Sequence, residues 1–343
     1  MALGLISLLI FALVVYFGAK TNTGKYAEAL TIQPFYQAVI HTSQDSTPSM
    51  WINRIQRDYG DNFTLYCTQI LRVPPKIAYQ IFQNPYIDSV SKEISLYWGS
   101  NNKEITQARA DLNIIMENYV TYFGDSTPPP LLGMMSMFGI QVALSDSAIW
   151  IGLDLFMNPN YRFYQGTQGL HAYQIRRTYP YFLPPVLAYS IAEDKVNHSF
   201  ESLKYRQGNL LNLMLREGLI LSIAKNLNPQ IHDSLLLGYT TDQWLWIENN
   251  ELDVWRKIIS EGALYTNDPV QCTRYIGDGP FTNGLTNNSP PSIGKFFGYR
   301  IIQHWLDKRG IKTFNSITKQ YLSPSRNNDL ILKESEYRGR GLQ

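Results

Sequence analysis

Residues 209–225 read NLLNLMLREGLILSIAK, and this stretch predicts the clearest helix of the chain. The helix should end before Asn228-Pro229, because the residue that precedes a proline disfavours helical backbone. Shorter helices are expected at residues 168–178 and 185–193, each bounded by proline or glycine. The chain beyond Pro159 is therefore predicted to be mainly helical.

Two further helices have recognisable start signals. Thr240 and Gln243 stand at the spacing of a capping box, in which the hydroxyl and the amide each satisfy a free N–H group at the start of a helix. The sequence SPPS at residues 289–292 opens another helix. Gly294 and Gly298 lie one turn apart in it, and this spacing lets a second backbone approach closely.

The segment before these helices predicts strands as well as a helix. Residues 105–123 carry apolar side chains at steps of three and four, which is the pattern of an amphipathic helix. The prolines within residues 125–130 then exclude helix. Residues 140–156 are rich in β-branched and aromatic side chains and predict two strands joined by a turn at residues 145–147. The fold class is therefore expected to be α+β.

The composition is that of a folded and nearly neutral chain. Its 343 residues carry 30 Lys and Arg against 28 Asp and Glu, and 13% of them are aromatic. The aromatic content excludes disorder for most of the length, and a formal charge of +2 gives no extended positive field for nucleic acid. Two cysteines cannot form a disulfide framework. The length predicts about two domains, or one large one.

An uncharged apolar run, ALGLISLLIFALVVYFGA at residues 2–19, stands apart from the rest of the sequence. It is at the short edge of what spans a bilayer, and it predicts a signal peptide or a membrane-anchor helix at residues 1–20. We expect export across a membrane, with the body on the far side. Residues 21–50 are then expected to be a spacer, residues 51–332 a globular domain and residues 333–343 a polar tail.

Most catalytic motifs are missing from the sequence. There is no H-E-x-x-H pair of histidines and no G-x-S-x-G elbow, and Lys295 follows Gly294 in a poor match to a P-loop. The carboxylates that remain as candidates are Glu217 and Asp154. Asp154 ends a predicted strand, where an acid either lines a site or caps a helix. The Glu193-Asp194 pair indicates a helix terminus.

Glu217 lies inside an otherwise apolar helix, where a buried charge without a partner would be costly. One interpretation is a metal ligand or general base exposed in a cleft. The other is a carboxylate at the solvent edge of an amphipathic helix, paired with Arg216 or Lys225. The Arg176-Arg177 pair is interpreted as a solvated face, although a carboxylate or a lipid phosphate would also satisfy it.

Several segments, in their order along the chain, resemble the GldB-type gliding-motility lipoproteins of Bacteroidetes. They include IGLDLFMNPNYRFY, YFLPPVLAYSIAE, NLLNLMLREGLILSIAKNLNP, GYTTDQWLWIENNELDVW and SPPSIGKFFGYRIIQHWLDKRG. The resemblance covers about residues 142–310. It implies a cell-envelope protein needed for gliding and for the secretion machinery that serves it, with envelope proteins as partners and no established reaction.

The resemblance also implies a zincin-like fold, mainly helical with a small mixed β-sheet, that has lost its metal site. In active proteins of that fold, an H-E-x-x-H helix precedes a second helix whose Glu-Gly pair completes the zinc site. Here the first helix, VLAYSIAE, has no histidine, and Glu217-Gly218 keeps the carboxylate alone. One carboxylate cannot hold a zinc ion that ordinarily takes three protein ligands. We therefore expect Glu217 to be vestigial, and we expect no metal, no other cofactor and no catalysis.

The sequence departs from the family pattern near its start. A lipoprotein of this family carries a cysteine at the end of its signal sequence, but the apolar run here ends Gly18-Ala19-Lys20 and the first cysteine is Cys67. A retained membrane helix is then the simpler expectation. It would hold the protein at the cell envelope with its body in the periplasm.

Protein interaction is the expected mode of action. The candidate surfaces are Trp244 and Trp255 on one helix, the Arg176-Arg177 pair, and the loop at residues 277–292, because exposed aromatic and arginine side chains anchor interfaces. Trp at helical spacing is also common in protein cores. The surface and the core therefore both remain possible places for these side chains.

Two other functions remain open from the sequence. One is a zinc metallopeptidase with a non-standard metal site, in which Glu217 acts with His171 or His198 arriving from elsewhere in the fold. The other is a carbohydrate-binding envelope module, which only the Tyr and Trp content favours.

Overall fold

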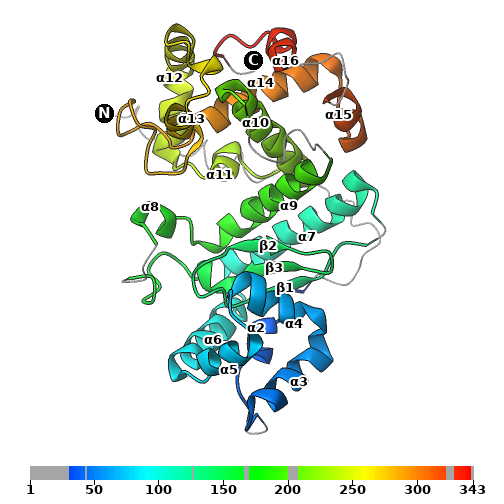
Figure 1. Ribbon diagram of the computed structural model, residues 1–343. Helices are drawn as coiled ribbons and strands as arrows, with labels where there is room; N and C mark the ends of the chain where they lie inside the picture. Colours follow the sequence, from blue (N-terminus) through cyan, green and yellow to red (C-terminus); the bar gives the residue numbers. More distant parts are fainter. Residues whose placement is uncertain are drawn as a thin grey trace, which may run out of the picture.

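The computed structural model describes residues 31–42, 45–125, 127–165, 170–199, 208–321 and 328–340. The described chain is elongated, with the N-terminal helices at one end, the sheet in the middle and the C-terminal helices at the other end (Figure 1). Helices dominate and the strands form one small mixed sheet, so the expected α+β class is confirmed. The apolar run at residues 2–19 lies outside the described ranges. None of the described helices combines the length and the hydrophobicity that a membrane span requires.

The N-terminal helices pack on the β1 side of the sheet and share its core. Phe35 and Val39 are fully buried, and Gln33 forms an isolated bridge with Leu132 of the sheet. The folded domain therefore begins well before residue 51, because these apolar side chains, which fall in the expected spacer, are part of its core. The elements of this part are α2 (Phe35–Ala38), α3 (Pro48–Tyr59), α4 (Asp61–Leu65), the π-helical turn η1 (Tyr66–Ile70), α5 (Pro75–Phe82) and α6 (Pro85–Trp98). The next helix, α7 (Lys103–Phe123), lies apart from them and packs against α9 (Leu183–Ser199) and α10 (Leu210–Leu227) (Figure 1).

Three short strands form the sheet, in the order β1-β3-β2. Strands β2 (Val142–Leu144) and β3 (Ile149–Gly152) are antiparallel and joined by the turn at residues 145–147, as predicted. Strand β1 (Leu131–Met134) is parallel to β3 and was not predicted, since four residues are too short a run to show a pattern. Both β1 and β3 are fully buried, whereas β2 is half-buried at the edge of the sheet.

The C-terminal part is helical, as expected. Helix α10 (Leu210–Leu227) begins after Asn209, whose side-chain oxygen accepts a hydrogen bond from the Asn212 N–H. The predicted capping box of Thr240 and Gln243 is present at the start of α12 (Thr241–Ser260). The other elements are the 3-10 turns η2 (Leu153–Leu155), η3 (Pro180–Phe182) and η5 (Ala263–Tyr265), and the helices α8 (Ala172–Ile175), α9 (Leu183–Ser199), α11 (Asp233–Leu237), α13 (Pro269–Ile276), α14 (Ile293–Arg309), α15 (Phe314–Tyr321) and α16 (Asn328–Ser335).

Two of the helices differ in length from the predictions. Residues 168 and 169 of the helix expected at residues 168–178 lie outside the described chain, and in the rest of that range only the short turn α8 is α-helical. The Thr178 hydroxyl closes this turn by donating to the Ile175 carbonyl at 2.7 Å. Helix α9 is longer than the predicted residues 185–193. Prolines lie in its first turn, where the backbone N–H has no helical partner in any case, so they start the helix rather than bound it.

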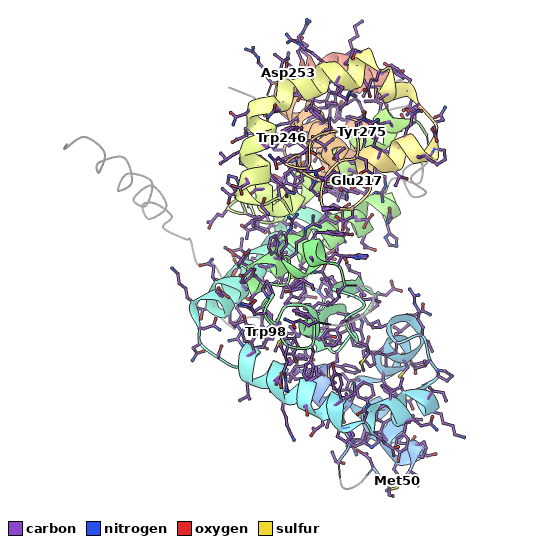
Figure 2. All side chains as sticks on the ribbon, turned by 90° about the vertical axis from the view of Figure 1, so that its left-hand side faces the viewer. Met50, Trp98, Glu217, Trp246, Asp253 and Tyr275 are labelled. Atoms are coloured by element: carbon purple, nitrogen blue, oxygen red, sulfur yellow. The ribbon has the colours of Figure 1, made fainter. Side chains whose placement is uncertain are left out.

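Helices α10 and α14 touch through their backbones at two glycines. A Cβ atom added to Gly298 would lie 1.7 Å from the Met214 carbonyl oxygen, and one added to Gly218 would lie 2.1 Å from the Gly298 carbonyl oxygen. The predicted close approach at Gly298 is therefore confirmed. Figure 2 shows that Glu217, the neighbour of Gly218, lies inside the C-terminal part, far from Met50 at the other end.

The segment expected to be a polar tail is packed against the domain up to residue 340. Tyr337 is buried, with its ring 5.1 Å from that of Trp255, and its hydroxyl donates to the Glu251 carboxylate at 2.7 Å. The folded domain therefore extends beyond residue 332, because this aromatic side chain completes the core around α12. Residues 341–343 lie outside the described part of the chain.

Candidate functional site

Glu217 lies in the middle of α10 and is only 1% exposed. Its Oε2 atom accepts a hydrogen bond from the Tyr189 hydroxyl at 2.5 Å and lies 3.0 Å from Nζ of Lys295. Its Oε1 atom lies 3.0 Å from Nη1 of Arg216. These partners come from α9, α10 and α14, so three helices converge on one carboxylate. A buried charge that would be costly alone is thus stabilised by two cations and a hydroxyl.

Arg216 extends this cluster to a second carboxylate on α9. Its Nη2 atom lies 3.1 Å from Oε1 of Glu193 and donates to Oδ1 of Asn197 at 2.9 Å. Glu193, Arg216, Glu217 and Lys295 therefore alternate in charge, and we call these four residues the charge cluster. Glu193 was expected at a helix terminus, but α9 continues beyond it to Ser199, and the Glu193 carboxylate pairs with Arg216 of α10.

The environment of Glu217 differs from both interpretations of the sequence. The carboxylate is buried, so it does not lie at a solvent edge, and both of its oxygens are engaged by neighbouring side chains. The expected pairing with Arg216 is confirmed. Lys225 instead pairs with Asp233 of α11 at 3.0 Å. The structure thus places Glu217 in a closed cluster rather than free in a cleft.

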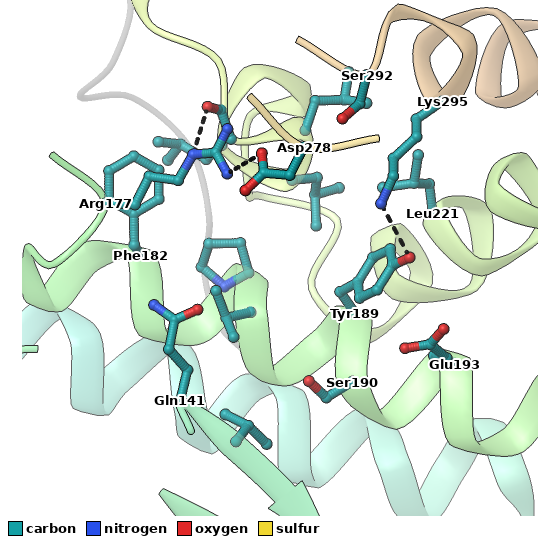
Figure 3. A pocket seen from close by; sticks show the side chains of 17 residues that line it. Gln141, Arg177, Phe182, Tyr189, Ser190, Glu193, Leu221, Asp278, Ser292 and Lys295 are labelled. Carbon is teal, nitrogen blue, oxygen red and sulfur yellow. Dashed lines mark hydrogen bonds and ion pairs between the residues drawn. The ribbon is translucent and has the colours of Figure 1, made fainter. Parts of the chain in front are cut away.

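A cavity of about 440 Å³ lies beside the charge cluster, between α9, α11, α14 and the start of β2 (Figure 3). Tyr189, Glu193 and Lys295 line one side of it. On the other side, Nη1 of Arg177 lies 3.2 Å from Oδ1 of Asp278. The apolar side chains that line the cavity are Val142, Phe182, Pro185, Val186, Leu221, Leu235, Leu236 and Leu237.

Arg176 and Arg177 are half-buried anchors rather than a solvated face. Nε of Arg177 donates to the Gly238 carbonyl at 3.1 Å, and Nη2 of Arg176 donates to the Gln243 side chain at 3.2 Å. Burial lowers the pKa of Arg176, and the neighbouring Arg177 lowers it further. Both arginines therefore connect the turn after α8 to the start of α12, and Arg177 also lines the cavity.

The two tryptophans proposed as a contact surface have different environments. Trp255 is 6% exposed, and its ring lies 5.5 Å from that of Phe297 and 5.1 Å from that of Tyr337, so it belongs to the core. Trp244 is half-buried against Phe296, with ring centroids 6.1 Å apart. The surface predicted on α12 is therefore reduced, because one of its two aromatic side chains faces inward.

The loop at residues 277–292 is partly internal. Thr282 and Ser289 are buried, and the Thr282 hydroxyl donates to the Pro290 carbonyl at 2.8 Å. The hydroxyl of Ser292 donates to the Gly277 carbonyl at 2.7 Å and closes the base of the loop. The loop is thus held in one shape and presents Asp278 to the cavity.

The two histidines proposed as zinc ligands do not join Glu217. His171 stacks on Tyr173 at the start of α8, with ring centroids 5.7 Å apart, and His198 is an exposed partner of Asp194 at the end of α9. Within the described ranges, no group of three or more His, Cys, Asp or Glu side chains is placed to hold a metal ion. The described residues therefore offer no ligand set for zinc at this cluster.

Asp154, the other candidate carboxylate, is a structural residue. It is 1% exposed and accepts hydrogen bonds from the N–H groups of Ser136, at 3.0 Å, and Phe138, at 2.8 Å. Met137 and Phe138 have positive φ angles of 55° and 60°, which are unfavourable for side chains of this size. Asp154 therefore holds a strained turn next to the sheet and does not line the cavity.

Asp154 is expected to make the stability of the protein depend on pH. Burial raises the pKa of this carboxyl from 3.8 to about 6, although the hydrogen bonds from Ser136 and Phe138 oppose the shift. The folded chain therefore binds the Asp154 proton more tightly than the unfolded chain does. The stabilisation that this proton gives to the folded state is fully present below pH 3.8 and is lost as the pH rises through about 6. The free energy of unfolding should fall by up to about 3 kcal/mol across this range.

Urea unfolding at about pH 4 and about pH 7 measures this effect as a difference between the wild type and Asp154→Asn. The variant lacks the titrating group, so the fall in its stability between the two pH values should be smaller, whatever its absolute stability. Equal pH dependence of the two proteins would show that Asp154 titrates normally.

Sequence reasoning missed three residues of the site. Tyr189 and Glu193 stand four positions apart on α9, and that spacing puts both on the face that meets α10. This spacing is visible in the sequence, but it indicates a site only when the helix that packs against this face of α9 is known. Lys295 gave no signal beyond a failed P-loop match, because its role depends on the contact between α10 and α14.

The fold and the cavity define a mainly helical α+β protein in which a closed charge cluster borders a small cavity. The family model described as gliding motility protein GldB matches residues 19–339, and the chain belongs to that family. The match extends beyond the expected residues 142–310 and includes the N-terminal helices. Neither a search of curated proteins nor one of solved structures finds a match. Family membership indicates involvement in gliding motility and a place at the cell envelope.

Proposed function

We propose that the protein supports gliding motility and the associated secretion machinery by binding other envelope proteins, without catalysing a reaction. Family membership supports the pathway, and the closed charge cluster supports binding over catalysis. The apolar run at residues 2–19 would hold the chain at the membrane, with the body in the periplasm.

The observation that carries this proposal is the ion pair between Lys295 and Glu217. The Lys295 ammonium lies 3.0 Å from Oε2, so a metal ion bound to this oxygen would compete with a cation that is already there. A metal ion would have to displace this cation and lie close to the Arg216 guanidinium as well. Use of Glu217 as a general base would also require the pair to separate, at the cost of a buried unpaired charge.

We infer that α9 and α10 correspond to the two metal-binding helices of a zincin whose ligands have been replaced. Residues 189–193 read YSIAE, so Tyr189 and Glu193 stand where H-E-x-x-H has its histidines, and Ser190 stands where it has its general base. Tyr189 contacts Glu217, the counterpart of the third ligand, at 2.5 Å. This correspondence supports a pseudo-peptidase that keeps the arrangement of the helices without the chemistry.

Deletion of the gene tests the proposed pathway. The deletion strain is expected to lose colony spreading and to secrete less protein through the machinery that serves gliding. Re-expression of the intact gene should restore both, which is the control for effects on neighbouring genes. Normal spreading and secretion in the deletion strain would count heavily against the proposal.

Metal content separates this proposal from the zinc metallopeptidase alternative. We expect the purified protein to contain no stoichiometric zinc, because the two carboxylates at the former ligand positions, Glu217 and Glu193, are paired with Lys295 and Arg216. Stoichiometric zinc that is lost in Glu217→Gln would instead favour the peptidase.

A further inference from the structure

Arg176 carries a charge that no acidic side chain neutralises within the described chain. Its one hydrogen bond there runs from Nη2 to Oε1 of Gln243 at 3.2 Å, and that oxygen also accepts the Thr240 N–H at 3.1 Å. A guanidinium has five N–H donors, so most of those of Arg176 are left for a ligand. Neither Nε nor Nη1 of Arg176 is among the described polar atoms that are buried without a partner, so solvent reaches both atoms.

The charged groups that act on Arg176 leave a net positive charge in this region. Burial lowers the pKa of Arg176 most, Arg177 lowers it further, and Asp278 raises it. Arg177 and Asp278 pair with each other at 3.2 Å, so their charges cancel. The one positive charge that remains matches the single negative charge of a carboxylate better than the nearly double charge of a phosphate group.

A cavity of about 320 Å³ lies beside Arg176, where the turn η3, helix α11 and the start of α12 meet, and we call it the Arg176 cavity. Among the described residues that line it, Arg176 is the only one with a formal charge. Phe182, Leu235 and Gly238 line this cavity and also the one beside the charge cluster, so they form the wall between the two. The volume of the Arg176 cavity suits a small organic group.

The start of α12 adds positive potential to the Arg176 cavity. Thr241, the first residue of this helix, lines the cavity. The N–H groups of Thr241 and Asp242 have no hydrogen-bond partner in the part of the chain that the structure describes, and free N–H groups at the start of a helix attract anions. The Asp242 carboxylate is exposed and does not line the cavity. Arg176 and the helix terminus therefore both favour an anion there.

Aromatic rings form much of the apolar lining. The rings of Tyr179 and Tyr181 stack, with centroids 5.0 Å apart and planes inclined by 14°, and the ring of Tyr181 lies 4.9 Å from that of Phe182. All three residues line the Arg176 cavity. Aromatic side chains accommodate a flat apolar group against their faces and edges. The lining thus combines one cation with an aromatic wall.

We propose that the Arg176 cavity binds a carboxylate carried by an apolar group, either on a free small molecule or at the end of a partner protein. The guanidinium holds both carboxylate oxygens with parallel N–H donors, an arrangement that arginine offers and lysine does not. The apolar group lies against Tyr179 and Tyr181. This site is separate from Glu217, and the inference does not depend on the proposed role in gliding.

Phenylacetate is the probe, and ligand-observed NMR follows its binding to the purified full chain in detergent. We expect a dissociation constant of about 1 mM or lower, as the size of this molecule allows. Phenylacetamide, which is neutral, and inorganic phosphate, which lacks the ring, should each bind at least about tenfold more weakly. Absence of phenylacetate binding, or equal binding of either comparison compound, would overturn the inference.

Arg176→Gln is the matching change in the protein. It keeps a side chain that can donate to Gln243 but removes the charge, so phenylacetate binding should weaken by about tenfold or more. Arg256→Gln changes an exposed arginine of α12 and should bind phenylacetate like the wild type. Circular dichroism checks that both variants fold. Unchanged affinity in folded Arg176→Gln would contradict the proposal.

Thr241→Trp tests the cavity while Arg176 stays intact. Thr241 is exposed and lines the cavity, so a tryptophan at this position should obstruct it and weaken phenylacetate binding by about tenfold. Thr241→Ser leaves the cavity open and should bind normally. If Arg176→Gln does not fold, Thr241→Trp decides the question alone, and wild-type affinity of this variant would count against the site.

A short peptide that ends in phenylalanine identifies the source of the carboxylate. Binding at least as tight as that of phenylacetate, and lost when the C-terminus is amidated, assigns the site to the end of a partner chain. Weaker binding of the peptide than of phenylacetate assigns it to a free small acid. Either result supports the site. A deletion strain that still glides would leave the site standing, and failed phenylacetate binding would leave the role in gliding standing.

Discussion

Glu217→Gln is expected to lower the free energy of unfolding by about 3 kcal/mol or more, as the loss of one partner from a buried ion pair usually does. The change removes the carboxylate whose oxygens now lie 3.0 Å from both Lys295 and Arg216. Arg216 keeps Glu193 as a partner, so the larger part of the loss should come from Lys295. Denaturant unfolding followed by circular dichroism measures the free energy of unfolding of the variant and of the wild type.

Two controls make this result specific to the charge cluster. Glu248→Gln changes an exposed carboxylate of α12 in the same way and should alter the stability by less than about 0.5 kcal/mol. Glu217→Gln combined with Lys295→Met removes both charges and should recover most of the loss, because no unpaired ammonium remains. If Glu217→Gln were as stable as Glu248→Gln, the ion pairs of Glu217 in the charge cluster would not contribute to the stability of the fold.

Gly298→Ala is expected to destabilise the protein by at least about 3 kcal/mol, or to prevent folding. The new methyl group would lie 1.7 Å from the Met214 carbonyl oxygen and 2.4 Å from its carbonyl carbon. Both atoms belong to the backbone of α10, so no side chain can move aside and the two helices must separate. That separation would also move Lys295 on α14 away from Glu217.

Gly279→Ala is the matched control for this change. A Cβ atom at Gly279 would meet only the Phe281 carbonyl oxygen, at 3.5 Å, which is an ordinary contact. The midpoint of thermal unfolding of Gly279→Ala should stay close to that of the wild type, whereas the midpoint of Gly298→Ala should fall by many degrees. Equal midpoints for the two variants would show that α10 and α14 are not in backbone contact.

The parts of the fold that the sequence predicts are those with local signals. The run at residues 209–225, the capping box at Thr240 and the apolar stripe at residues 105–123 each depend on neighbours within a few positions, and each is a helix in the structure. Strand β1 has no such signal, because its pairing with β3 joins residues 18 positions apart. Phe35 likewise reads as part of a polar spacer until the sheet that buries it is known.

The site was only partly predictable, for the same reason. An acid in an apolar helix marks Glu217 from the sequence alone, since a buried charge needs a partner. The identity of that partner depends on α14 crossing α10 at Gly298, which no local pattern specifies. Trp255 shows the reverse case: a large aromatic residue suggested a surface, but Tyr337, from the expected tail, covers it.

The central claim is that the protein acts through binding and that Glu217 performs no chemistry. Rescue of the deletion strain by the double variant Glu217→Gln, Lys295→Met tests it most directly, because this variant lacks the carboxylate and should stay folded. Immunoblotting confirms that the variant is present at the level of the wild-type protein. We predict that it restores colony spreading. Loss of spreading in cells that contain the folded variant at the wild-type level would contradict the claim.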